Sequence, residues 1–422
     1  MAGLTCYAIT AASGAGPFGL PQPIASPAQA QTRDFFASLP FAIGFAVVGA
    51  LLLVAAIWLL RKRRERIKGR KALRWTSYVA GSLSLVLGLA FAANWYAGWL
   101  PNVEALRLRL GLGDSTREHA EMASSAPHPK DMGDQPVIGE HAPLARPQVF
   151  TKSGGRLPRG ATREFSLPAS ASLNLASDAV WIYTPPGYDP SGRVAYPVIY
   201  LLHGSPGGPV DWIASGAPEV LDQMITSGEL APVIAVAPAL GARAGTDSGC
   251  LDSTKPGGSQ IETFVSKTVR PWVENHFPVT TDRAASAIGG MSMGGYCAID
   301  QGLRHADQYG TVLSEMPYGS PGAAGGTMKS SQAEIDAVTP LKYISSLPLI
   351  DRYPVAAWFA VPDAEVKAQV GQEAEAMAKA LRERGQVAEV FIAPNQGHTW
   401  KMAIAALPDG LHFWQSQLNK IE

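Results

Sequence analysis

Ser292 occupies the centre of a Gly-x-Ser-x-Gly sequence, GMSMG, at residues 290–294. An apolar strand pattern precedes it and a helix pattern follows, and in that context a sharp turn lifts a serine hydroxyl out of the backbone as a nucleophile. The glycines at 290, 294 and 295 would let the chain and the helix pass close to one another. The alternative is a glycine-rich turn in a buried strand–helix unit, because so short a motif also arises by chance.

His398 and an acidic residue follow the serine in the chain order that a serine hydrolase with this turn requires. His398 lies in a loop directly after an apolar strand pattern, where a general base is expected; a surface histidine is the alternative. Asp363 follows the preceding strand pattern, and we expect its carboxylate to accept the histidine Nδ1–H. Glu365 is the second candidate for that role. Asp363 could instead cap a helix predicted to begin near Ala364.

Two backbone N–H groups could stabilise the oxyanion of an acyl-transfer reaction. One is the N–H of Met293, directly after the serine. The other is the N–H of Ser205, in a His-Gly turn that ends a buried strand, because Pro206 has no N–H to donate. His203, in the same turn, is interpreted as a structural residue.

Asp211 and Trp212 follow this turn and are the candidate substrate-binding residues, with loops 240–258 and 318–331 as candidate pocket walls. Core packing is the alternative for Trp212, because tryptophan is highly buried on average in folded proteins. The sequence has no Walker A motif, no Gly-x-Gly-x-x-Gly dinucleotide loop between a strand pattern and a helix pattern, and no histidine pair with metal-ligand spacing. We therefore expect the protein to use neither a cofactor nor a metal.

The sequences YLLHG at 200–204, GMSMGG at 290–295 and GHTW at 397–400 resemble the Putative esterase family. That family holds esterase D, feruloyl and enterochelin esterases, and the antigen 85 mycolyltransferases. The resemblance covers about residues 163–422 and implies an α/β-hydrolase fold with acyl-ester chemistry that needs no metal or cofactor. Antigen 85 proteins lack the His-Gly turn, carry other small residues after the nucleophile motif and use a glutamate as acid, so the resemblance leans to the esterases.

Alternating strand and helix patterns across residues 163–422 predict one α/β domain, a mostly parallel sheet with helices on both faces. A length of about 260 residues suits one such domain with a full core. Strands are expected near 163–169, 179–184, 197–202, 232–237, 283–289, 310–315, 355–361 and 387–392. Helices are expected near 217–227, 259–276, 293–305, 364–384 and 399–419.

Two apolar segments precede this domain, and each is long enough to span a bilayer. They run from Leu39 to Leu60 and from Thr76 to Leu100, and predict a transmembrane hairpin over residues 38–100. The loop between them, residues 61–74, is strongly basic, so the positive-inside rule places it in the cytoplasm; a nucleic-acid patch is the alternative. Both termini and the catalytic domain would then lie on the extracytoplasmic side of the cell membrane.

The remaining segments are predicted to lack a fold of their own. Residues 1–37 are rich in Ala, Gly, Pro and Ser, carry one basic residue, and should form a disordered extracytoplasmic segment. Residues 101–162 should form a linker with a short amphipathic run from Val103 to Leu112. The formal net charge is zero, but the basic loop offsets a mildly acidic domain, and we expect no nucleic-acid partner.

The chain has three cysteines, Cys6, Cys250 and Cys297. An oxidising compartment would permit a Cys250–Cys297 disulfide, which would pin a loop beside the helix after the nucleophile. Two free buried thiols are the alternative, because spacing alone does not show that the two Cα atoms approach within bonding range. Cys6 would be left unpaired.

Together these patterns predict a membrane-anchored extracytoplasmic serine esterase that hydrolyses acyl esters through a Ser-His-Asp triad and an acyl-enzyme. The predicted location favours an ester of an envelope lipid or glycan over a soluble metabolite. Two alternatives stay open. One is an antigen 85-like acyltransferase that passes the acyl group to an envelope alcohol. The other is a catalytically silent hydrolase fold that serves as a binding module.

Overall fold

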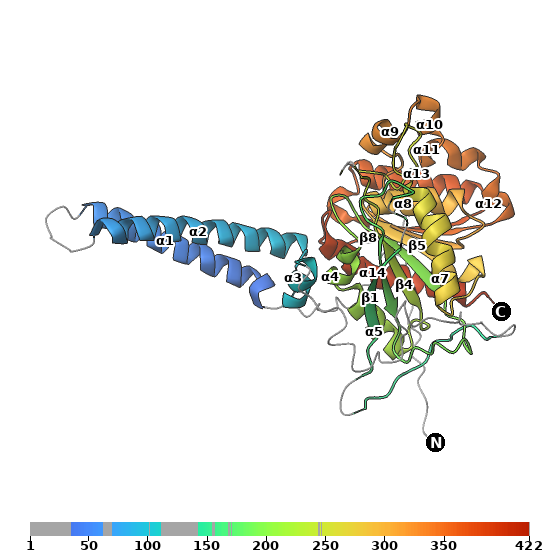
Figure 1. Ribbon diagram of the computed structural model, residues 1–422, viewed down its shortest axis with the longest axis horizontal. Coiled ribbons are helices and arrows are strands. Elements are labelled where there is room, and N and C mark those ends of the chain that lie inside the picture. The colour runs from blue at the N-terminus through green and yellow to red at the C-terminus, as the bar shows by residue number, and fades with distance from the viewer. Residues whose placement is uncertain are drawn as a thin grey trace, which may run out of the picture.

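The computed structural model shows a helical hairpin that projects from one side of an α/β domain (Figure 1). It describes residues 35–61, 70–100, 102–110, 142–153, 157–167, 169, 171–243, 245 and 247–421. Predictions for Cys6, most of the N-terminal segment, residues 62–69 of the basic loop and residues 111–141 of the linker fall outside the described residues.

One sheet forms the centre of the domain, with eight strands in the order β1-β2-β4-β3-β5-β6-β7-β8. β1 and β2, and likewise β2 and β4, pair antiparallel, and every other neighbouring pair is parallel. The central strands are buried along their whole length, which explains their continuous apolar sequences. The strands are β1 (Ala161–Ser166), β2 (Ala179–Thr184), β3 (Val198–Leu202), β4 (Ile234–Pro238), β5 (Ser286–Met291), β6 (Thr311–Glu315), β7 (Ala356–Pro362) and β8 (Val387–Ala393).

Helices cover both sides of this sheet (Figure 1), so the predicted fold class is confirmed. They are α4 (Val210–Ser215), α5 (Ala217–Ser227), α6 (Ile261–Thr263), α7 (Arg270–His276), α8 (Met293–Arg304), α9 (Ala323–Met328), α10 (Gln332–Asp336), α11 (Pro340–Tyr343), α12 (Leu349–Arg352), α13 (Gln369–Glu383) and α14 (Trp400–Leu418).

Two predicted helices differ from the observed ones. The helix expected at 259–276 is divided into α6, a π-helical segment over Phe264–Val269, and α7. Pro271 lies in the first turn of α7 and has no N–H for the regular helical ladder, which accounts for the interruption. The helix expected at 364–384 begins only at Gln369, after a separate 3-10 turn over Asp363–Glu365.

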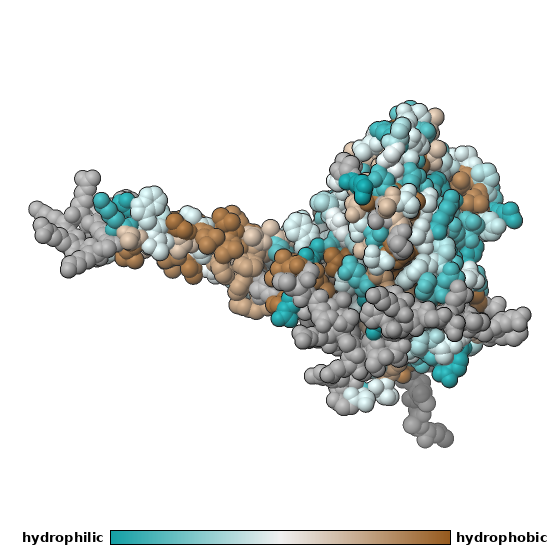
Figure 2. Space-filling view, in the orientation of Figure 1, coloured by the Kyte–Doolittle hydropathy of each residue, from teal (hydrophilic) through white to brown (hydrophobic). Residues whose placement is uncertain are grey.

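α1 (Leu39–Arg61) and α2 (Arg70–Ala97) form the hairpin, and small residues line the surface where they meet. A Cβ atom added to Gly49 would lie 2.9 Å from the Gly81 carbonyl oxygen, so the two backbones nearly touch. Ser84 Oγ donates a hydrogen bond of 2.9 Å to the Phe45 carbonyl across this interface. The large apolar side chains point outward (Figure 2), among them Val47, Leu51, Val54, Val79, Leu83 and Leu89.

Small residues inside and large apolar residues outside are typical of helix pairs in lipid. The spans Leu39–Trp58 and Lys71–Ala97 are long and apolar enough to cross a membrane, and only 17% of the most apolar window in each is buried. A core helix of a globular protein would instead be mostly buried.

Two stretches of the predicted linker, α3 and residues 142–150, contact the domain. α3 (Val103–Arg109) lies beside α4 where the hairpin meets the domain (Figure 1). Farther along, the N–H of Ala145 donates to the Ala195 carbonyl at 2.8 Å, and the N–H of Phe150 donates to the Thr226 carbonyl at 3.0 Å. The backbone of residues 142–150 is thus hydrogen-bonded to the domain.

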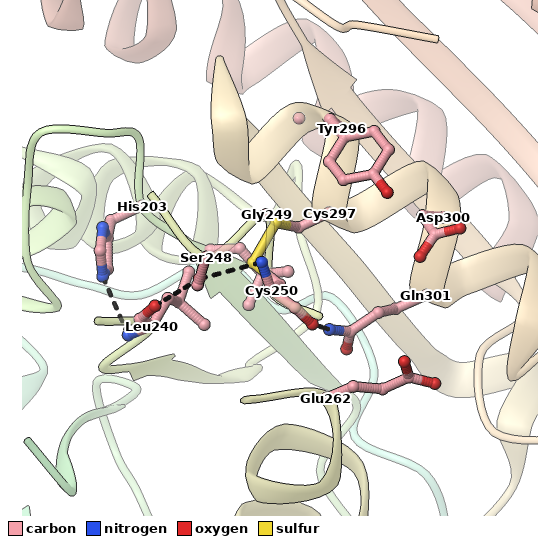
Figure 3. The surroundings of a disulfide bond; sticks show 12 residues. His203, Leu240, Ser248, Gly249, Cys250, Glu262, Tyr296, Cys297, Asp300 and Gln301 are labelled. Carbon is pink, nitrogen blue, oxygen red and sulfur yellow. Dashed lines mark hydrogen bonds between the residues drawn. A yellow bond between two sulfur atoms is a disulfide. The ribbon is translucent and has the colours of Figure 1, made fainter. Parts of the chain in front are cut away.

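A disulfide joins Cys250, in the loop after β4, to Cys297 on α8 (Figure 3). The two Cα atoms lie 5.7 Å apart, and 47 positions separate the residues in sequence. The predicted disulfide is therefore present, and it ties a long loop to the helix that follows Ser292.

The Arg304 side chain, at the end of α8, ties that helix to α6. Its two terminal nitrogens donate to the two carboxylate oxygens of Glu262, each at 2.7 Å, and it also pairs with Asp300 at 2.7 Å. His305 Nε2 lies 2.8 Å from Glu262 Oε1. Burial raises the pKa of Glu262, but hydrogen bonds from His305 and Arg304 outweigh it and lower that pKa to about 2.

Replacing Glu262 with glutamine (E262Q) should destabilise the domain by on the order of 3 kcal/mol at pH 7, because ionised Glu262 is stabilised in the folded state. The pKa of Glu262 falls from 4.5 to about 2 on folding, so this stabilisation is complete above pH 4.5 and is lost as the pH falls toward 2. Urea unfolding at several pH values measures the difference. E383Q, which removes an exposed partner of Lys379, is the control and should change stability little. A difference independent of pH would contradict the assignment.

Replacing both Cys250 and Cys297 with serine should lower the free energy of unfolding by about 2–4 kcal/mol, because the cross-link restricts the unfolded chain. Thermal unfolding with and without a reductant measures it. Reductant should lower the melting temperature of the wild type and leave the double variant unchanged. Equal melting temperatures for the wild type under both conditions would show that the disulfide does not contribute.

Candidate active site

Ser292 lies in the turn between β5 and α8, with φ 56° and ψ −118°. A non-glycine residue in so sparsely populated a conformation costs about 1–3 kcal/mol, which the surroundings must offset. The Ser292 N–H donates to the Glu315 carbonyl at 2.9 Å, and the Ser292 carbonyl accepts from the Tyr296 N–H at 3.0 Å. The neighbouring strand and the following helix therefore hold the strained turn from both ends.

Glycines surround this turn where a side chain would collide with backbone. A Cβ atom on Gly294 would lie 2.1 Å from the Leu202 oxygen, and one on Gly290 would lie 2.2 Å from the Gly294 oxygen. A Cβ atom on Gly295 would lie 2.4 Å from the Glu315 oxygen. The predicted close passage of strand and helix is thus present in the structure.

His398 lies in the loop between β8 and α14, and its Nδ1 lies 2.9 Å from Glu365 Oε2. Both side chains are about one quarter exposed, at 25% and 26%. When Nδ1–H donates to a carboxylate, Nε2 is the ring nitrogen left to accept a proton. The pair therefore has the arrangement of a general base and the acid that orients it.

Asp363 does not take the role predicted for it. Its carboxylate accepts the backbone N–H groups of Asn395, at 2.7 Å, and Gln396, at 3.1 Å. The 3-10 turn over Asp363–Glu365 brings the second carboxylate, and not the first, to His398. Glu365, the second candidate, thus replaces Asp363 as the partner of His398. Asp363 instead holds the backbone of the loop residues that precede His398 in the sequence.

Tyr318 lies near both Ser292 and His398, although the sequence indicated it only as part of a candidate pocket wall. Its phenol lies within hydrogen-bonding reach of the Ser292 side chain. Its ring centroid lies 6.0 Å from that of His398. Burial raises the pKa of Tyr318, and the charge of Glu365 raises it further, so the phenol stays protonated near neutral pH. Its position just after β6, beside the nucleophile strand, is the sequence signal that could have identified it.

The His-Gly turn after β3 lies against the serine. A Cβ atom on Gly204 would lie 2.5 Å from Met291 Sδ and 3.6 Å from Ser292 Cβ. Met293, at the start of α8, is buried, and Ser205 is exposed in the turn. The assignment of their N–H groups as oxyanion donors stays a prediction, and the adjacency of turn and serine is what that prediction requires.

His203 supports this turn from inside the domain. Its Nδ1 lies 2.7 Å from the Gly204 carbonyl oxygen, and its Nε2 accepts the Leu240 N–H at 3.1 Å. One ring nitrogen therefore donates while the other accepts, which is the pattern of a neutral imidazole. Burial lowers the pKa of His203, in agreement with this neutral form. The geometry is that of the structural residue expected from the sequence.

A chain of hydrogen bonds connects His203 to the disulfide (Figure 3). The Leu240 carbonyl accepts the Ser248 hydroxyl at 2.6 Å, and Ser248 Oγ accepts the Cys250 N–H at 3.0 Å. The Cys250 carbonyl accepts Gln301 Nε2 from α8 at 3.0 Å. The loop after β4 thereby links the nucleophile helix to the support of the His-Gly turn.

Asp211 and Trp212 are not positioned to bind substrate as predicted, because they are only 2% and 1% exposed. Asp211 accepts the Gly208 N–H at 2.9 Å, inside the turn. Trp212 Nε1 donates to the Leu202 carbonyl at 3.0 Å, and its ring packs edge-on against Trp400 at 5.1 Å. Core packing, the alternative for Trp212, is what the structure shows, and Asp211 is likewise structural.

Residues 172–407 match the Putative esterase family. The chain belongs to this family. A ferulic acid esterase of known structure has 26% identity and a TM-score of 0.52, over 62% of this chain and 99% of that one. The fold of the domain is thus the predicted α/β-hydrolase fold.

Curated relatives match a shorter region of this chain. An esterase of Mycobacterium tuberculosis is 32% identical over 140 residues, which are 33% of this chain and 28% of that protein. An uncharacterised protein of Corynebacterium glutamicum is 31% identical over 140 residues, 33% of this chain and 32% of that protein. The chain thus spans about a third of the length of the curated relatives it matches.

Replacing Glu365 with glutamine (E365Q) should lower kcat for ester turnover by on the order of 10³–10⁴, because an amide neither fixes the histidine tautomer nor stabilises imidazolium. Replacing Asp363 with asparagine (D363N) keeps an oxygen acceptor for the loop and should cost far less. Steady-state kinetics of both variants on one ester measure the difference. A larger loss for D363N than for E365Q would restore Asp363 as the triad acid.

Proposed function

We propose that this protein is a serine carboxylic ester hydrolase with Ser292 as nucleophile, His398 as general base and Glu365 as the orienting acid. The His398–Glu365 hydrogen bond carries the proposal, because it gives the loop histidine the orienting carboxylate that a triad needs. The third member would be Ser292 in its strained turn. The family supports ester substrates. The turn around Ser205 and the start of α8 at Met293 supply the proposed oxyanion donors.

The reaction would proceed through an acyl-enzyme. His398 Nε2 takes the Ser292 proton as Oγ attacks the ester carbonyl carbon, and Glu365 stabilises the resulting imidazolium. The N–H groups of Met293 and Ser205 would hold the oxyanion, and loss of one such donor typically costs about 2.7–4 kcal/mol. His398 then protonates the leaving alcohol, and water releases the acyl group by the same steps in reverse.

We place the hairpin α1–α2 in the cell membrane, with the catalytic domain on the extracytoplasmic side. The outward apolar side chains and the small-residue interface support a lipid environment. The disulfide supports an oxidising compartment for the domain. The basic sequence between the helices supports a cytoplasmic hairpin tip.

The end of α2 supports a lipid ester as substrate over a glycan ester. Lys401, just after the histidine loop, lies over the Trp95 ring with Nζ 5.7 Å from the centroid. A Cβ atom on Gly397 would lie 2.7 Å from the Tyr96 hydroxyl. Tryptophan and tyrosine favour the membrane–water interface. The histidine loop would therefore lie near the level of the lipid headgroups, within reach of an ester carried by an envelope lipid.

Acyl transfer to an envelope alcohol is the second candidate. The observation that favours it is the glutamate partner of His398, since antigen 85 proteins, which the chain resembles, use a glutamate as acid. Hydrolysis and transfer share the acyl-enzyme and differ in whether water or an alcohol releases it. Ester turnover that rises when an alcohol is added, with a new ester as product, would favour transfer.

The full chain in detergent should react with a fluorophosphonate probe at Ser292, and Ser292→Ala should abolish the labelling. The same substitution should lower ester turnover by a factor on the order of 10⁴–10⁶, because the covalent step is lost. Gel fluorescence and a spectrophotometric ester assay measure the two. Labelling that persists in the variant, or a folded wild type that is not labelled, would overturn the proposed triad.

A further inference from the structure

Arg109 connects the hairpin to the catalytic domain, although it lies outside the region that matches the family. At the end of α3, its Nη1 forms an ion pair with Asp211 Oδ1 at the start of α4. Its Nε donates to the Trp99 carbonyl at 3.3 Å, just beyond α2. One side chain thus contacts both the end of the proposed anchor and the helix that follows the His-Gly turn.

The segment between α2 and Arg109 is held by its own hydrogen bonds. The Asn94 side chain accepts the Leu100 N–H at 2.8 Å and donates to the Leu100 carbonyl at 2.9 Å. Asn102 caps α3 by accepting the Ala105 N–H at 2.8 Å. These contacts fix where α3 begins relative to α2, and so fix the position from which Arg109 reaches the domain.

The Asp211 carboxylate lies inside the His-Gly turn. Oδ2 accepts the Gly208 N–H at 2.9 Å, and a Cβ atom on Gly207 would lie only 2.4 Å from the same oxygen. The side chain of Asp211 is 3% exposed, whereas that of Arg109 is 25% exposed. Removing one partner of a buried pair leaves an uncompensated charge and is strongly destabilising locally. Without Arg109, the unpaired Asp211 carboxylate should move toward solvent, and its hydrogen bond to the Gly208 N–H in the His-Gly turn should break.

We propose that Arg109 is a positioning residue for the His-Gly turn. Helix α3, which lies next to the proposed membrane anchor, would then help to set the geometry of the active site. Arg109 acts through Asp211 on residues 204–208, which carry the Ser205 N–H. A displacement of about 1 Å at such a donor can cost about 10²-fold in rate. This inference rests on the proposed function, because it requires that the turn stabilises an oxyanion.

The test uses the full chain in detergent and compares the wild type with R109A, R109K, D211A and the double variant R109A/D211A. Active sites are titrated with a fluorophosphonate, so that kcat refers to folded, competent molecules. A short-chain p-nitrophenyl ester gives kcat and KM. A trifluoromethyl ketone, whose serine adduct places an oxyanion in the hole, reports on the turn independently of turnover. R193A, which breaks the exposed Arg193–Asp189 pair, is the matched control.

R109A should lower kcat per titrated site by about 10-fold to 100-fold with little change in KM, since a misplaced donor acts in the transition state. Affinity for the trifluoromethyl ketone should fall in parallel with kcat/KM. R109K keeps the charge and should recover part of the loss. The double variant should be no worse than the poorer single variant, because both substitutions break one contact. R193A should match the wild type.

Two results would overturn the inference. The first is a kcat per site within about twofold of the wild type for R109A, with unchanged inhibitor affinity. The second is an R109A variant with a raised KM and an unchanged kcat per site. Failure of the proposed function gives a different result, because the wild type itself would then show neither ester turnover nor labelling at Ser292. If R109A yields too few folded molecules to titrate, R109K must show the intermediate loss, and its equality with the wild type would overturn the inference.

Discussion

The Leu202 carbonyl oxygen lies where a side chain on Gly294 would be, and this close approach of β3 and α8 sets the geometry of the site. It brings the end of β3, and with it the His-Gly turn, directly against the nucleophile turn. Between β5 and α8 the chain reverses within one residue, and Ser292 takes its strained positive-φ conformation there. Contacts elsewhere in the domain can be understood as holding these two turns together.

Different interactions hold each turn. α8 is secured at a distance from the serine, by the disulfide at Cys297 and by the Arg304–Glu262 pair at its far end. The His-Gly turn is secured from beneath, by His203 and by the Asp211 carboxylate. The loop after β4 joins the two systems, because Ser248 and Cys250 connect Leu240 to Gln301 on α8. Rigidity of this kind suits a site whose donors must stay within fractions of an ångström of the oxyanion position.

Sequence sufficed for those parts of the site that depend on local pattern. The sheet followed from apolar runs, and the positions of Ser292 and His398 directly after strands followed from motifs, since functional residues of a parallel sheet lie at the carboxyl ends of its strands. Their catalytic roles stay predictions. The choice between Asp363 and Glu365 did not follow, because it depends on a single 3-10 turn and on which carboxylate finds backbone donors in a loop some 30 residues away. Asp211 and Trp212 were misassigned because burial is a property of the whole fold. The disulfide could be suggested but not decided, since spacing alone cannot give a Cα separation.

The contact between Gly98 and Lys401 has a consequence for how the proposed enzyme would reach its substrate. A Cβ atom on Gly98 would lie 3.0 Å from the Lys401 backbone nitrogen, so the hairpin abuts the catalytic domain directly. With the hairpin in a bilayer as proposed, this contact would keep the catalytic domain close to the lipid surface and limit the height of Ser292 above it. Under the proposed function, the enzyme would then meet mainly those esters that lateral diffusion in the membrane brings to the domain.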